Sequence, residues 1–293
     1  MHGVKFKKYY NFKHNKGKGW FYAFTAKNDF IAVINDILFE KSILFFTNFA
    51  VMNIVMSPSS TPSFNLAAEE YLFSRKGEDF LLLYINEPSV IIGSNQAVLN
   101  EVDPDFCIEH NIRIIRRLSG GGAVYHDGGN LNYAFIQDST GAPLSARFLE
   151  PVVTVLHEWG IPVEIGKRKD LWLKGYKISG TASHVSRGRE LHHGTLLYDT
   201  DLEMLQRALT SENGRLIKKA TPSVPSPVRN IRSYLAEQQE TTGNTIAFFD
   251  GLSGKLLTHY GLDKISTLQR EEIAQIEELQ RSKYTQRHWN YRM

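Results

Sequence analysis

The sequence has a single cysteine, Cys107, among its 293 residues. One thiol excludes an internal disulfide and any zinc site built from cysteines, and it fits a reducing compartment such as the cytoplasm. The formal net charge is only +3, too small a surplus to indicate a nucleic-acid partner. No uninterrupted apolar run reaches membrane-spanning length, because Asn35-Asp36 and Glu40-Lys41 break the most hydrophobic stretch. We therefore expect a cytoplasmic protein with neither a nucleic-acid nor a membrane partner.

Composition and length place the chain among ordinary globular proteins. It is 42% hydrophobic and 22% charged, which is typical of a chain that buries a sizeable core. Its 293 residues are enough for one large domain or for two smaller ones. We find no internal repeat, so repeat architectures are not expected.

The first 51 residues differ from the rest. Lysines alternate with aromatic residues over about the first 30 positions, a pattern that can serve single-stranded nucleic acid or an anionic membrane surface. The alternation gives no face that could pack, so we favour an unstructured, solvated tail. The stretch has no arginine and no clean apolar core with a cleavage site, which argues against a mitochondrial presequence and a secretory signal. We predict an extension over residues 1–51 that is poorly ordered or partly packed.

The most informative stretch runs from residue 112 to residue 136. Apolar residues lead into Arg116 and Arg117, the glycines Gly120–Gly122 follow, and a second strand-like run begins at Leu131. Three glycines remove every side chain there, so N–H groups can point inward and form an anion-binding concavity. An arginine at the entry adds the bidentate donor that phosphate or carboxylate recognition uses. The spacing fits neither a Walker loop nor a dinucleotide fingerprint, so the residues alone predict an anion-contacting loop.

A second group of polar residues lies between residues 169 and 198. Lys177 precedes Ser179 and can offer a point positive charge, which suits an acyl-phosphate. Asp170 can hold Mg²⁺ or orient that lysine. His192 and His193 are neighbours on a predicted strand, so at most one of them faces a pocket and a metal pair is a poor candidate.

The pattern of apolar residues predicts the remaining elements. We expect strands at residues 81–85 and 90–92 to form a hairpin, Ser63 to cap a helix, and antiparallel strands in three segments over residues 169–198. Turns are predicted at Lys174-Gly175 and Arg187-Gly188. Further helices are expected at residues 104–110, 148–159, 202–209, 231–235, 246–259 and 271–279, with a surface loop at residues 211–230.

Four stretches resemble the lipoate–protein ligase A family: Met52–Val55, Phe64–Leu72, Arg116–Asp127 and Lys177–Gly180. The resemblance runs from residue 52 to residue 290. It implies an α/β (α+β) fold, a mixed and largely antiparallel sheet flanked by helices, of the biotin/lipoate protein ligase type. The catalytic domain would then cover residues 52–293.

The resemblance also implies a function. Such an enzyme activates lipoate with ATP to lipoyl-AMP and transfers the lipoyl group to a lysine of an acceptor domain. Its cofactors would be ATP and Mg²⁺, and its partners the lipoyl domains of 2-oxo acid dehydrogenase complexes and the glycine cleavage H protein. Lys177 would be the catalytic residue. The residues implied for substrate or adenylate binding are Arg117, Ser119, Gly122, Ala123, Val124, Tyr125, Asp170, Lys177 and His193, with Asp170 as a possible magnesium ligand.

The sequence departs from the family after Trp289-Asn290, where family ligases continue into a small accessory domain. Three enzymatic alternatives follow: a complete ATP-dependent ligase, a lipoyl- or octanoyl-transferase that uses a preformed acyl-adenylate or a separate accessory subunit, and an octanoyltransferase that forms a cysteine thioester. The third is disfavoured because Cys107 lies far upstream of Lys177. A non-enzymatic lipoyl-domain binder should have lost Arg117 or Lys177, and both are present.

Overall fold

The chain divides into two units, Met1–Phe49 and Ala50–Met293. A computed structural model describes residues 9–14, 17–26, 29–34, 52–139, 146–210, 223–241 and 243–292.

In the first unit the described backbone forms a three-stranded antiparallel sheet in the order β1-β2-β3. Its strands are Tyr9–His14 (β1), Gly17–Ala26 (β2) and Asp29–Ile34 (β3). Composition favoured an unstructured tail here, and the paired strands differ from that expectation. Residues 35–51 of the extension predicted over residues 1–51 lie outside the described residues.

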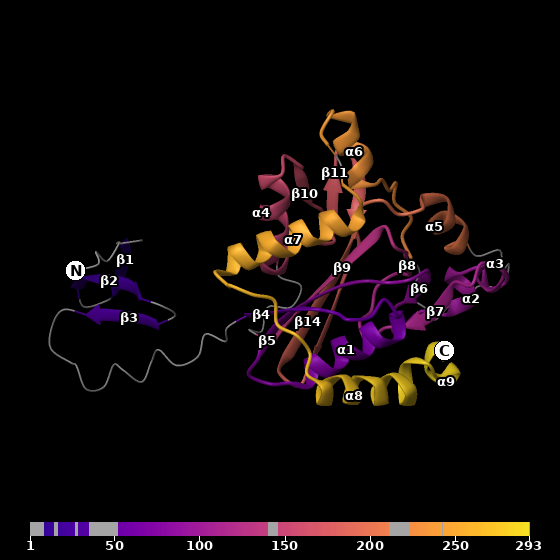
Figure 1. Ribbon diagram of the computed structural model, residues 1–293, viewed down its shortest axis with the longest axis horizontal. Coiled ribbons are helices and arrows are strands. Elements are labelled where there is room, and N and C mark those ends of the chain that lie inside the picture. The colour runs from indigo at the N-terminus through magenta and orange to yellow at the C-terminus, as the bar shows by residue number, and fades with distance from the viewer. Residues whose placement is uncertain are drawn as a thin grey trace. The chain divides into compact units, whose positions relative to one another are not determined.

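The second unit is built on a five-stranded mixed sheet in the order β13-β14-β9-β5-β4 (Figure 1). β4 runs parallel to β5, whereas every other pair of neighbours in this sheet is antiparallel. The strands are Met52–Met56 (β4), Asp79–Ile85 (β5), Asn130–Asp138 (β9), Thr181–Ser186 (β13) and Arg189–Leu197 (β14).

Two three-stranded sheets belong to the same unit. In the order β7-β6-β8, β6 is parallel to β7 and antiparallel to β8, while the sheet β10-β11-β12 is antiparallel throughout. Their strands are Ser89–Ile92 (β6), Arg113–Arg116 (β7), Val124–His126 (β8), Val163–Ile165 (β10), Leu171–Leu173 (β11) and Tyr176–Ser179 (β12).

Helices cover both faces of the five-stranded sheet, with α4 and α7 on one face and α1 and α8 on the other (Figure 1). This arrangement confirms the predicted α/β (α+β) class. The described helices are Pro62–Ser74 (α1), Val98–Glu101 (α2), Pro104–Glu109 (α3), Glu150–Glu158 (α4), Leu202–Ala208 (α5), Ile231–Glu237 (α6), Thr245–Tyr260 (α7), Arg270–Leu279 (α8) and Arg287–Asn290 (α9), with a 3₁₀ turn at Ala146–Phe148 and a π-helical turn at Gln280–Tyr284.

The two cores are separated by the alternation of side chains along the central strands. Leu81 and Leu83 of β5 point into the core beneath α4 and α7, whereas Leu82 and Tyr84 point into the core beneath α1 and α8. A strand covered on both faces is expected to be apolar at consecutive positions, as β5 is.

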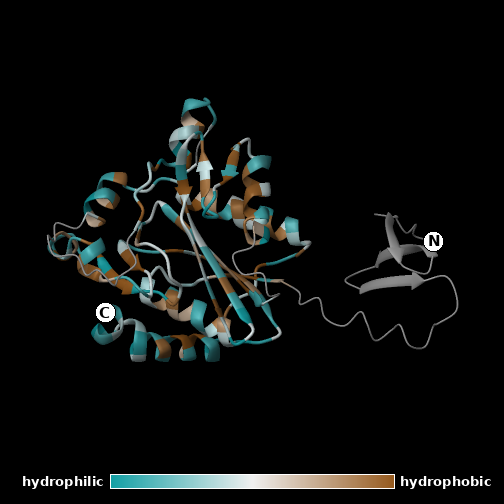
Figure 2. Cartoon of the chain, turned by 180° about the vertical axis from the view of Figure 1, so that it is seen from behind, coloured by the Kyte–Doolittle hydropathy of each residue, from teal (hydrophilic) through white to brown (hydrophobic). Residues whose placement is uncertain are grey.

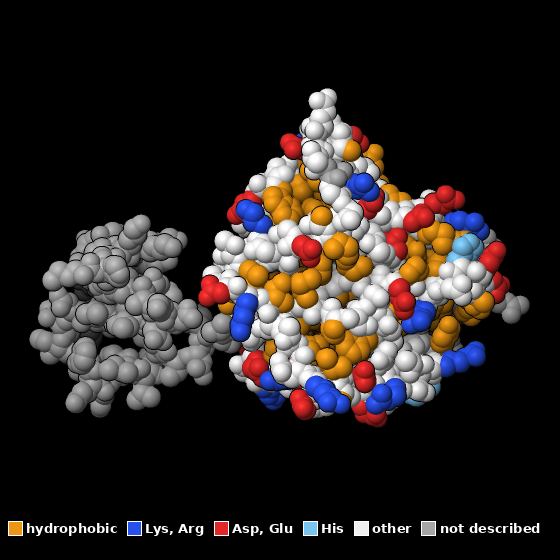
Figure 3. Space-filling model, viewed as in Figure 1, with side chains coloured by type: hydrophobic (Ala, Val, Ile, Leu, Met, Phe, Trp, Pro, Cys, Tyr) orange, Lys and Arg blue, Asp and Glu red, His pale blue; other side chains and the backbone are white. Residues whose placement is uncertain are grey.

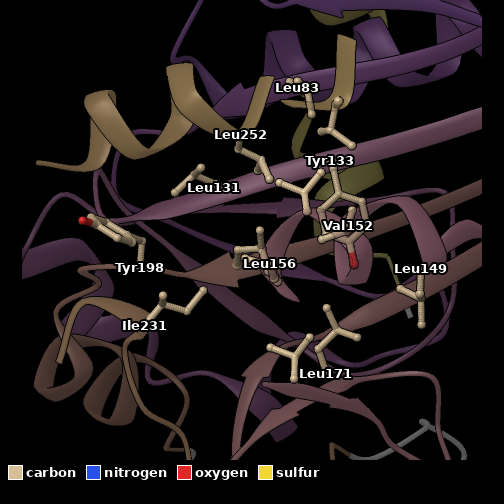
Figure 4. Packing of buried hydrophobic residues seen from close by; sticks show 14 of the residues in the cluster. Leu83, Leu131, Tyr133, Leu149, Val152, Leu156, Leu171, Tyr198, Ile231 and Leu252 are labelled. Atoms are coloured by element: carbon tan, nitrogen blue, oxygen red, sulfur yellow. The ribbon is translucent and has the colours of Figure 1, made fainter. Parts of the chain in front are cut away.

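Figure 4 shows the core on the α4 and α7 face. Leu131 and Tyr133 of β9 pack there with Val152 and Leu156 of α4 and with Leu252 of α7, and each is at most 1% exposed. Burying one such side chain stabilises the fold by about 1.5–3 kcal/mol relative to its exposed state. This packing fixes the sheet on which the site is built.

Figure 3 shows lysine, arginine, aspartate and glutamate side chains dispersed over one face of the second unit, and that face has no dominant field of one sign. Figure 2 shows hydrophilic and hydrophobic residues side by side on the helices and the strands. Within the described ranges no helix is both long enough and apolar enough to cross a membrane.

The predicted antiparallel run over residues 169–198 is confirmed, with its turns at the predicted positions. Both residues of each turn have a positive φ: 50° and 83° at Lys174 and Gly175, and 51° and 78° at Arg187 and Gly188. A type I′ hairpin turn requires this geometry. The run contains four strands instead of three, divided between two sheets.

Two local predictions were wrong. β5 and β6 form as strands but lie in different sheets, because both edges of β5 are already paired, one with β4 and the other with β9. Thr61 is the N-cap of α1 instead of Ser63. Pro62 takes the first helical position, where a backbone N–H would have no partner within the helix, so the missing N–H of proline costs no hydrogen bond.

Candidate active site

A cavity of about 400 Å³ lies between the loop of residues 117–123 and strands β12, β13 and β14. The loop connects β7 to β8, and residues of α1, β5 and β9 also contribute to the wall. The cavity is lined by Leu66, Tyr84, Ile91, Arg117, residues 120–124, His126, Asn132, Arg168, Asp170, Lys177, residues 180–183, residues 193–195, Ser223 and Val224.

The loop of residues 117–123 packs tightly against Gly93. A methyl group at Gly93 would overlap the carbonyl oxygen of Gly121, so the close approach requires glycine. The Ser94 amide donates to the Ser119 carbonyl at 2.8 Å and fixes the start of the loop. Gly121 has a φ of 85°, in the left-handed region that favours glycine. Glycine is therefore needed both in the loop and beside it.

Arg117 holds the loop from within. Its Nη2 donates to the carbonyls of Gly120 at 2.6 Å and Gly122 at 2.7 Å, and its Nη1 donates to the Ile91 carbonyl at 2.9 Å. Its Nε donates to Ser119 Oγ at 3.0 Å. Burial lowers the pKa of Arg117 to about 10, so the group stays charged at neutral pH. The Arg117 guanidinium therefore binds the backbone of the loop. The sequence had instead indicated that it would form bidentate hydrogen bonds with a ligand.

The amide groups of the loop are arranged differently from its carbonyls. The amides of Gly120, Gly121 and Gly122 have no partner among the described residues, whereas the Ala123 amide donates to Ser223 Oγ at 3.0 Å. These three glycines line the cavity, so their amides can contribute to an anion-binding concavity.

Lys177 on β12 supplies a second positive charge to the cavity. Its Nζ lies 3.6 Å from Asp170 Oδ2, and Arg168 Nη2 lies 3.7 Å from the same oxygen. Asp170 is only 3% exposed, and its Oδ2 accepts no hydrogen bond from the described residues. Burial lowers the pKa of Lys177, and Asp170 opposes that effect. The ammonium is thus held loosely enough to turn towards an anion.

The inner end of the cavity combines apolar residues such as Leu66 and Ile91 with one free donor on His126. Asn65 donates to Asn86 Oδ1 at 2.8 Å, so Asn86 uses its amide nitrogen to donate to His126 Nδ1 at 2.9 Å. The network therefore assigns the proton to Nε2, which has no partner in the described part of the chain. Burial lowers the pKa of His126 to about 3, so the ring is neutral.

The structure brings most of the predicted site residues together. The cavity is lined by Arg117, Gly122, Ala123, Val124, Asp170, Lys177 and His193, whereas Ser119 and Tyr125 do not reach it. Tyr125 differs from the prediction because side chains alternate along β8. Val124 and His126 face the cavity, and Tyr125 packs in the core with Val90 and Phe106.

The two adjacent histidines face opposite sides of β14, as predicted. His193 lines the cavity, whereas His192 stacks on Phe148 with ring centroids 5.2 Å apart. His192 Nδ1 lies 2.7 Å from Ser183 Oγ. The second histidine therefore belongs to the packing of the sheet.

Sequence reasoning missed His126, Thr195 and Ser223 as lining residues. His126 lies two positions after Val124, and Thr195 lies two positions after His193, so the strand period would have found both. Ser223 comes from a proline-punctuated stretch without periodicity, and nothing local indicates its place.

The segment that contains Ser223 connects both sides of the cavity. Ser223 Oγ accepts from the Ala123 amide of the loop. Further along, the Lys177 amide donates to the Pro227 carbonyl at 2.8 Å, and the Arg229 amide donates to the Lys177 carbonyl at 3.3 Å. The segment therefore fixes the distance between the glycine loop and Lys177.

The fold and the cavity define a class of protein: an α/β domain with a cavity between a glycine-rich loop and a lysine. Over the ranges that the structure describes, no group of three or more His, Cys, Asp or Glu side chains is placed to hold a metal.

Comparison with known proteins identifies the family. Residues 61–247 match the model of the lipoyl protein ligase A/B catalytic domain. The chain is 34% identical over 240 residues to the lipoate-protein ligase LplJ of Bacillus subtilis, covering 78% of this chain and 70% of that protein. The chain belongs to the lipoate–protein ligase family, and it is an enzyme.

Solved structures agree with this assignment. A bi-partite lipoate protein ligase from Thermoplasma acidophilum, studied with its E2 lipoyl domain, is 25% identical with a TM-score of 0.68, covering 83% of this chain and 96% of that chain. A lipoate-protein ligase A bound with ATP is 26% identical with a TM-score of 0.67, covering 83% and 98%. Both likenesses confirm the biotin/lipoate ligase type of fold.

Proposed function

We propose that this chain activates lipoate with ATP to lipoyl-AMP and transfers the lipoyl group to a specific lysine of lipoyl acceptor domains. The observation that carries the proposal is that one cavity of about 400 Å³ is lined by Lys177 and by a glycine loop whose Gly120–Gly122 amides have no partner among the described residues. The family supports the same reaction, because one solved relative is a ligase bound with ATP.

The chemistry requires two anions to meet. A carboxylate is a poor acyl donor to an amine, so a lipoate oxygen first attacks the α-phosphorus of ATP, forms a mixed anhydride and releases pyrophosphate. The acceptor amine then attacks the acyl carbon, forms the amide, and releases AMP and a proton. Lys177 and the buried charge of Arg117 offset the repulsion between carboxylate and phosphate.

Each part of the cavity has a distinct role in the proposal. Lys177 places its charge at the reacting carboxyl and phosphate, and Asp170 orients that lysine. The amides of Gly120–Gly122 hold phosphate oxygens. The inner end, with Leu66 and the free Nε2–H of His126, takes the acyl tail.

Mg²⁺ belongs to the proposal as an ion bound mainly by phosphate oxygens. Magnesium in nucleotide sites uses one or two carboxylates together with phosphate and water. Asp170 fits this role because its buried Oδ2 accepts no hydrogen bond from the described residues. When bound, the ion would reduce the negative charge of the phosphates.

We also propose that the acceptors are the lipoyl domains of 2-oxo acid dehydrogenase complexes and the glycine cleavage H protein, in the cytoplasm. Support comes from the Thermoplasma acidophilum relative, which was studied with an E2 lipoyl domain. That relative is bi-partite, which favours a separate accessory subunit as a further partner.

The test offers the purified chain an isolated lipoyl domain in two arms, with ATP and lipoate in one and preformed lipoyl-adenylate in the other. Modification of the acceptor lysine in both arms, read by mass spectrometry, is the expected result. Modification in the adenylate arm alone would replace the proposal by the transferase that needs a separate activating subunit. No modification in either arm would refute it.

The thioester alternative is tested by Cys107→Ser. Cys107 lies on α3 and is 1% exposed, and burial raises the pKa of its thiol to about 11, so it is a poor nucleophile at neutral pH. We expect acyl transfer within about twofold of the unsubstituted chain, since buried cysteines behave as small hydrophobes. An acyl group trapped on Cys107 would instead establish a thioester mechanism.

A further inference from the structure

We infer that Glu69 and His193 are positioning residues that hold the glycine loop in its ligand-binding shape through Ser119 and Arg117. The inference rests on the proposed function only in that the loop is taken to hold the phosphate of the adenylate. The connection runs from α1, which carries Glu69, across β14 to the loop.

Four side chains form a continuous chain of hydrogen bonds. Arg117 Nε donates to Ser119 Oγ at 3.0 Å, and Ser119 Oγ lies 2.6 Å from His193 Nε2. His193 Nδ1 lies 2.9 Å from Glu69 Oε2 and 3.0 Å from Oε1. Glu69 Oε1 also accepts from the Tyr84 hydroxyl at 2.9 Å.

The neighbours fix the direction of the bonds at both ends of the chain. Ser119 Oγ accepts from Arg117 Nε. His193 Nδ1 faces only carboxylate oxygens of Glu69, so Nδ1 carries a proton and donates to them. Ser119 Oγ and His193 Nε2, 2.6 Å apart, join these two ends.

The chain is buried along its whole length, which makes each member costly to remove. Ser119 is 0% exposed, Glu69 2%, Arg117 4% and His193 8%. A buried polar group that loses its hydrogen-bond partner still has the unfavourable free energy of desolvation, now without a hydrogen bond to offset it. Without the Glu69 acceptor, His193 has no partner to hold its proton on Nδ1, and Ser119 loses its orientation.

The far end of the chain acts on the backbone of the loop. The guanidinium that binds Ser119 also binds the carbonyls of Gly120 and Gly122, at 2.6 and 2.7 Å. A peptide unit is planar and trans, so the Gly120 carbonyl that binds Arg117 directs the Gly121 amide to the opposite side, and the Gly122 carbonyl does the same for the Ala123 amide, which binds Ser223 Oγ. Glu69 does not itself line the cavity, so its effect on a ligand passes through the loop.

The test compares Glu69→Leu, Glu69→Gln and Ser119→Ala with the control Glu70→Gln. Glu70 is the next residue of α1 but binds Lys283 and Tyr284 on the C-terminal side of the molecule, away from the loop. Two readouts are taken on the full chain: amide hydrogen exchange of residues 119–123, and the KM for ATP against kcat for lipoyl-AMP formation.

Glu69→Leu and Ser119→Ala should each speed exchange in residues 119–123 at least tenfold and raise the KM for ATP at least tenfold. Glu69→Gln keeps an oxygen that accepts from His193 Nδ1, so it should stay within about threefold on both readouts. Glu70→Gln should leave both unchanged, whatever it does to the melting temperature.

Three outcomes would overturn the inference. One is unchanged loop exchange in folded Glu69→Leu and Ser119→Ala, and another is faster exchange spread evenly over the sheet, which marks a purely structural role. The third is an equal effect of Glu69→Gln and Glu69→Leu. If Glu69→Leu does not fold, Ser119→Ala decides, since it removes only one buried oxygen. Faster loop exchange in a chain that forms no lipoyl-AMP would support the positioning role and refute the proposed function.

Discussion

Arg116 and Arg117 are neighbours in the sequence, and both are buried, but they stabilise different parts of the molecule. Arg117 binds the carbonyls of the glycine loop beside the cavity. Arg116 is 0% exposed and points away from it. It donates to the carbonyls of Gly93, Ser94, Gln96, Trp289, Asn290 and Arg292.

The difference shows how a motif can contain two unlike functions. Arg116 ends β7 and Arg117 follows it, so strand alternation directs their side chains to opposite sides. Arg116 joins the C-terminal segment to the backbone at Gly93, whereas Arg117 shapes the glycine loop beside the cavity. Burial lowers the pKa of each to about 10, and both keep their charge at neutral pH. Both guanidinium groups already donate to protein oxygens, so neither is free to form bidentate hydrogen bonds with a ligand. The positive charges beside the cavity that are held by loose ion pairs are those of Lys177 and Arg168.

The largest effect should come from Lys177→Ala. Losing a charge that is placed on the transition state costs on the order of 3 kcal/mol or more, which predicts at least a 100-fold fall in kcat for acyl transfer. The melting temperature should change little, because the Lys177 ammonium makes only a loose 3.6 Å ion pair. Steady-state kinetics at saturating substrate and a melting curve measure both quantities.

The control for this prediction is Lys174→Ala, at the exposed turn between β11 and β12. It removes the same charge three residues away and should leave kcat within about twofold, as surface substitutions usually do. A near-normal kcat in Lys177→Ala would contradict the proposal that this lysine stabilises the transition state.

The second prediction separates the two arginines directly. A lysine keeps the charge but cannot reproduce the planar fork, so several carbonyls lose their donor at either position. Arg116→Lys should reduce the free energy of unfolding by about 2–3 kcal/mol with the KM for ATP unchanged, from the loss of charged hydrogen bonds. Arg117→Lys should raise the KM for ATP at least tenfold.

Denaturant titration and ATP kinetics on the two variants give the comparison. Equal changes in both quantities for Arg116→Lys and Arg117→Lys would mean that the two regions are not separate.

A smaller effect is expected at Gly93, where the two regions meet. Its carbonyl binds Arg116, and a methyl group on its Cα would overlap the Gly121 carbonyl oxygen of the loop. Gly93→Ala forces a methyl group against backbone, which is expected to cost about 1–3 kcal/mol of overpacking and to lower kcat/KM about tenfold. Gly254→Ala is the control, since α7 leaves open space there. A normal kcat/KM in Gly93→Ala would show that the loop can shift without loss.

Much of this architecture could be predicted because local patterns determine it. Helices α4, α7 and α8 follow from apolar spacing, and the I′ turns follow from Lys174-Gly175 and Arg187-Gly188. The fold type and the placement of Lys177 came from the family resemblance. Period-two alternation was sufficient to say that only one of the adjacent histidines faces the cavity.

The partners of those residues could not be predicted, because they come from distant parts of the chain. No sequence feature near Arg117 indicates that its guanidinium would donate to the carbonyls of its own loop. Nothing near Ser223 places it on the Ala123 amide, 100 positions away. The hairpin expected between β5 and β6 failed for the same reason, since β9 takes the edge of β5 from a distance of 48 positions at Tyr84 and Asn132.

The smallest effect is predicted for a chain that begins at Met52. Every described residue that lines the cavity lies between Leu66 and Val224, and the unit that contains them begins at Ala50. β4 starts at Met52 and pairs with β5, so this chain keeps the whole five-stranded sheet. We expect the same kcat for acyl transfer and a melting temperature within a few degrees, because no core residue described in that unit is lost. Side-by-side expression, melting curves and limited proteolysis of the two chains check the prediction. An insoluble chain, or one that melts far below the full sequence, would instead give residues 1–51 a structural role.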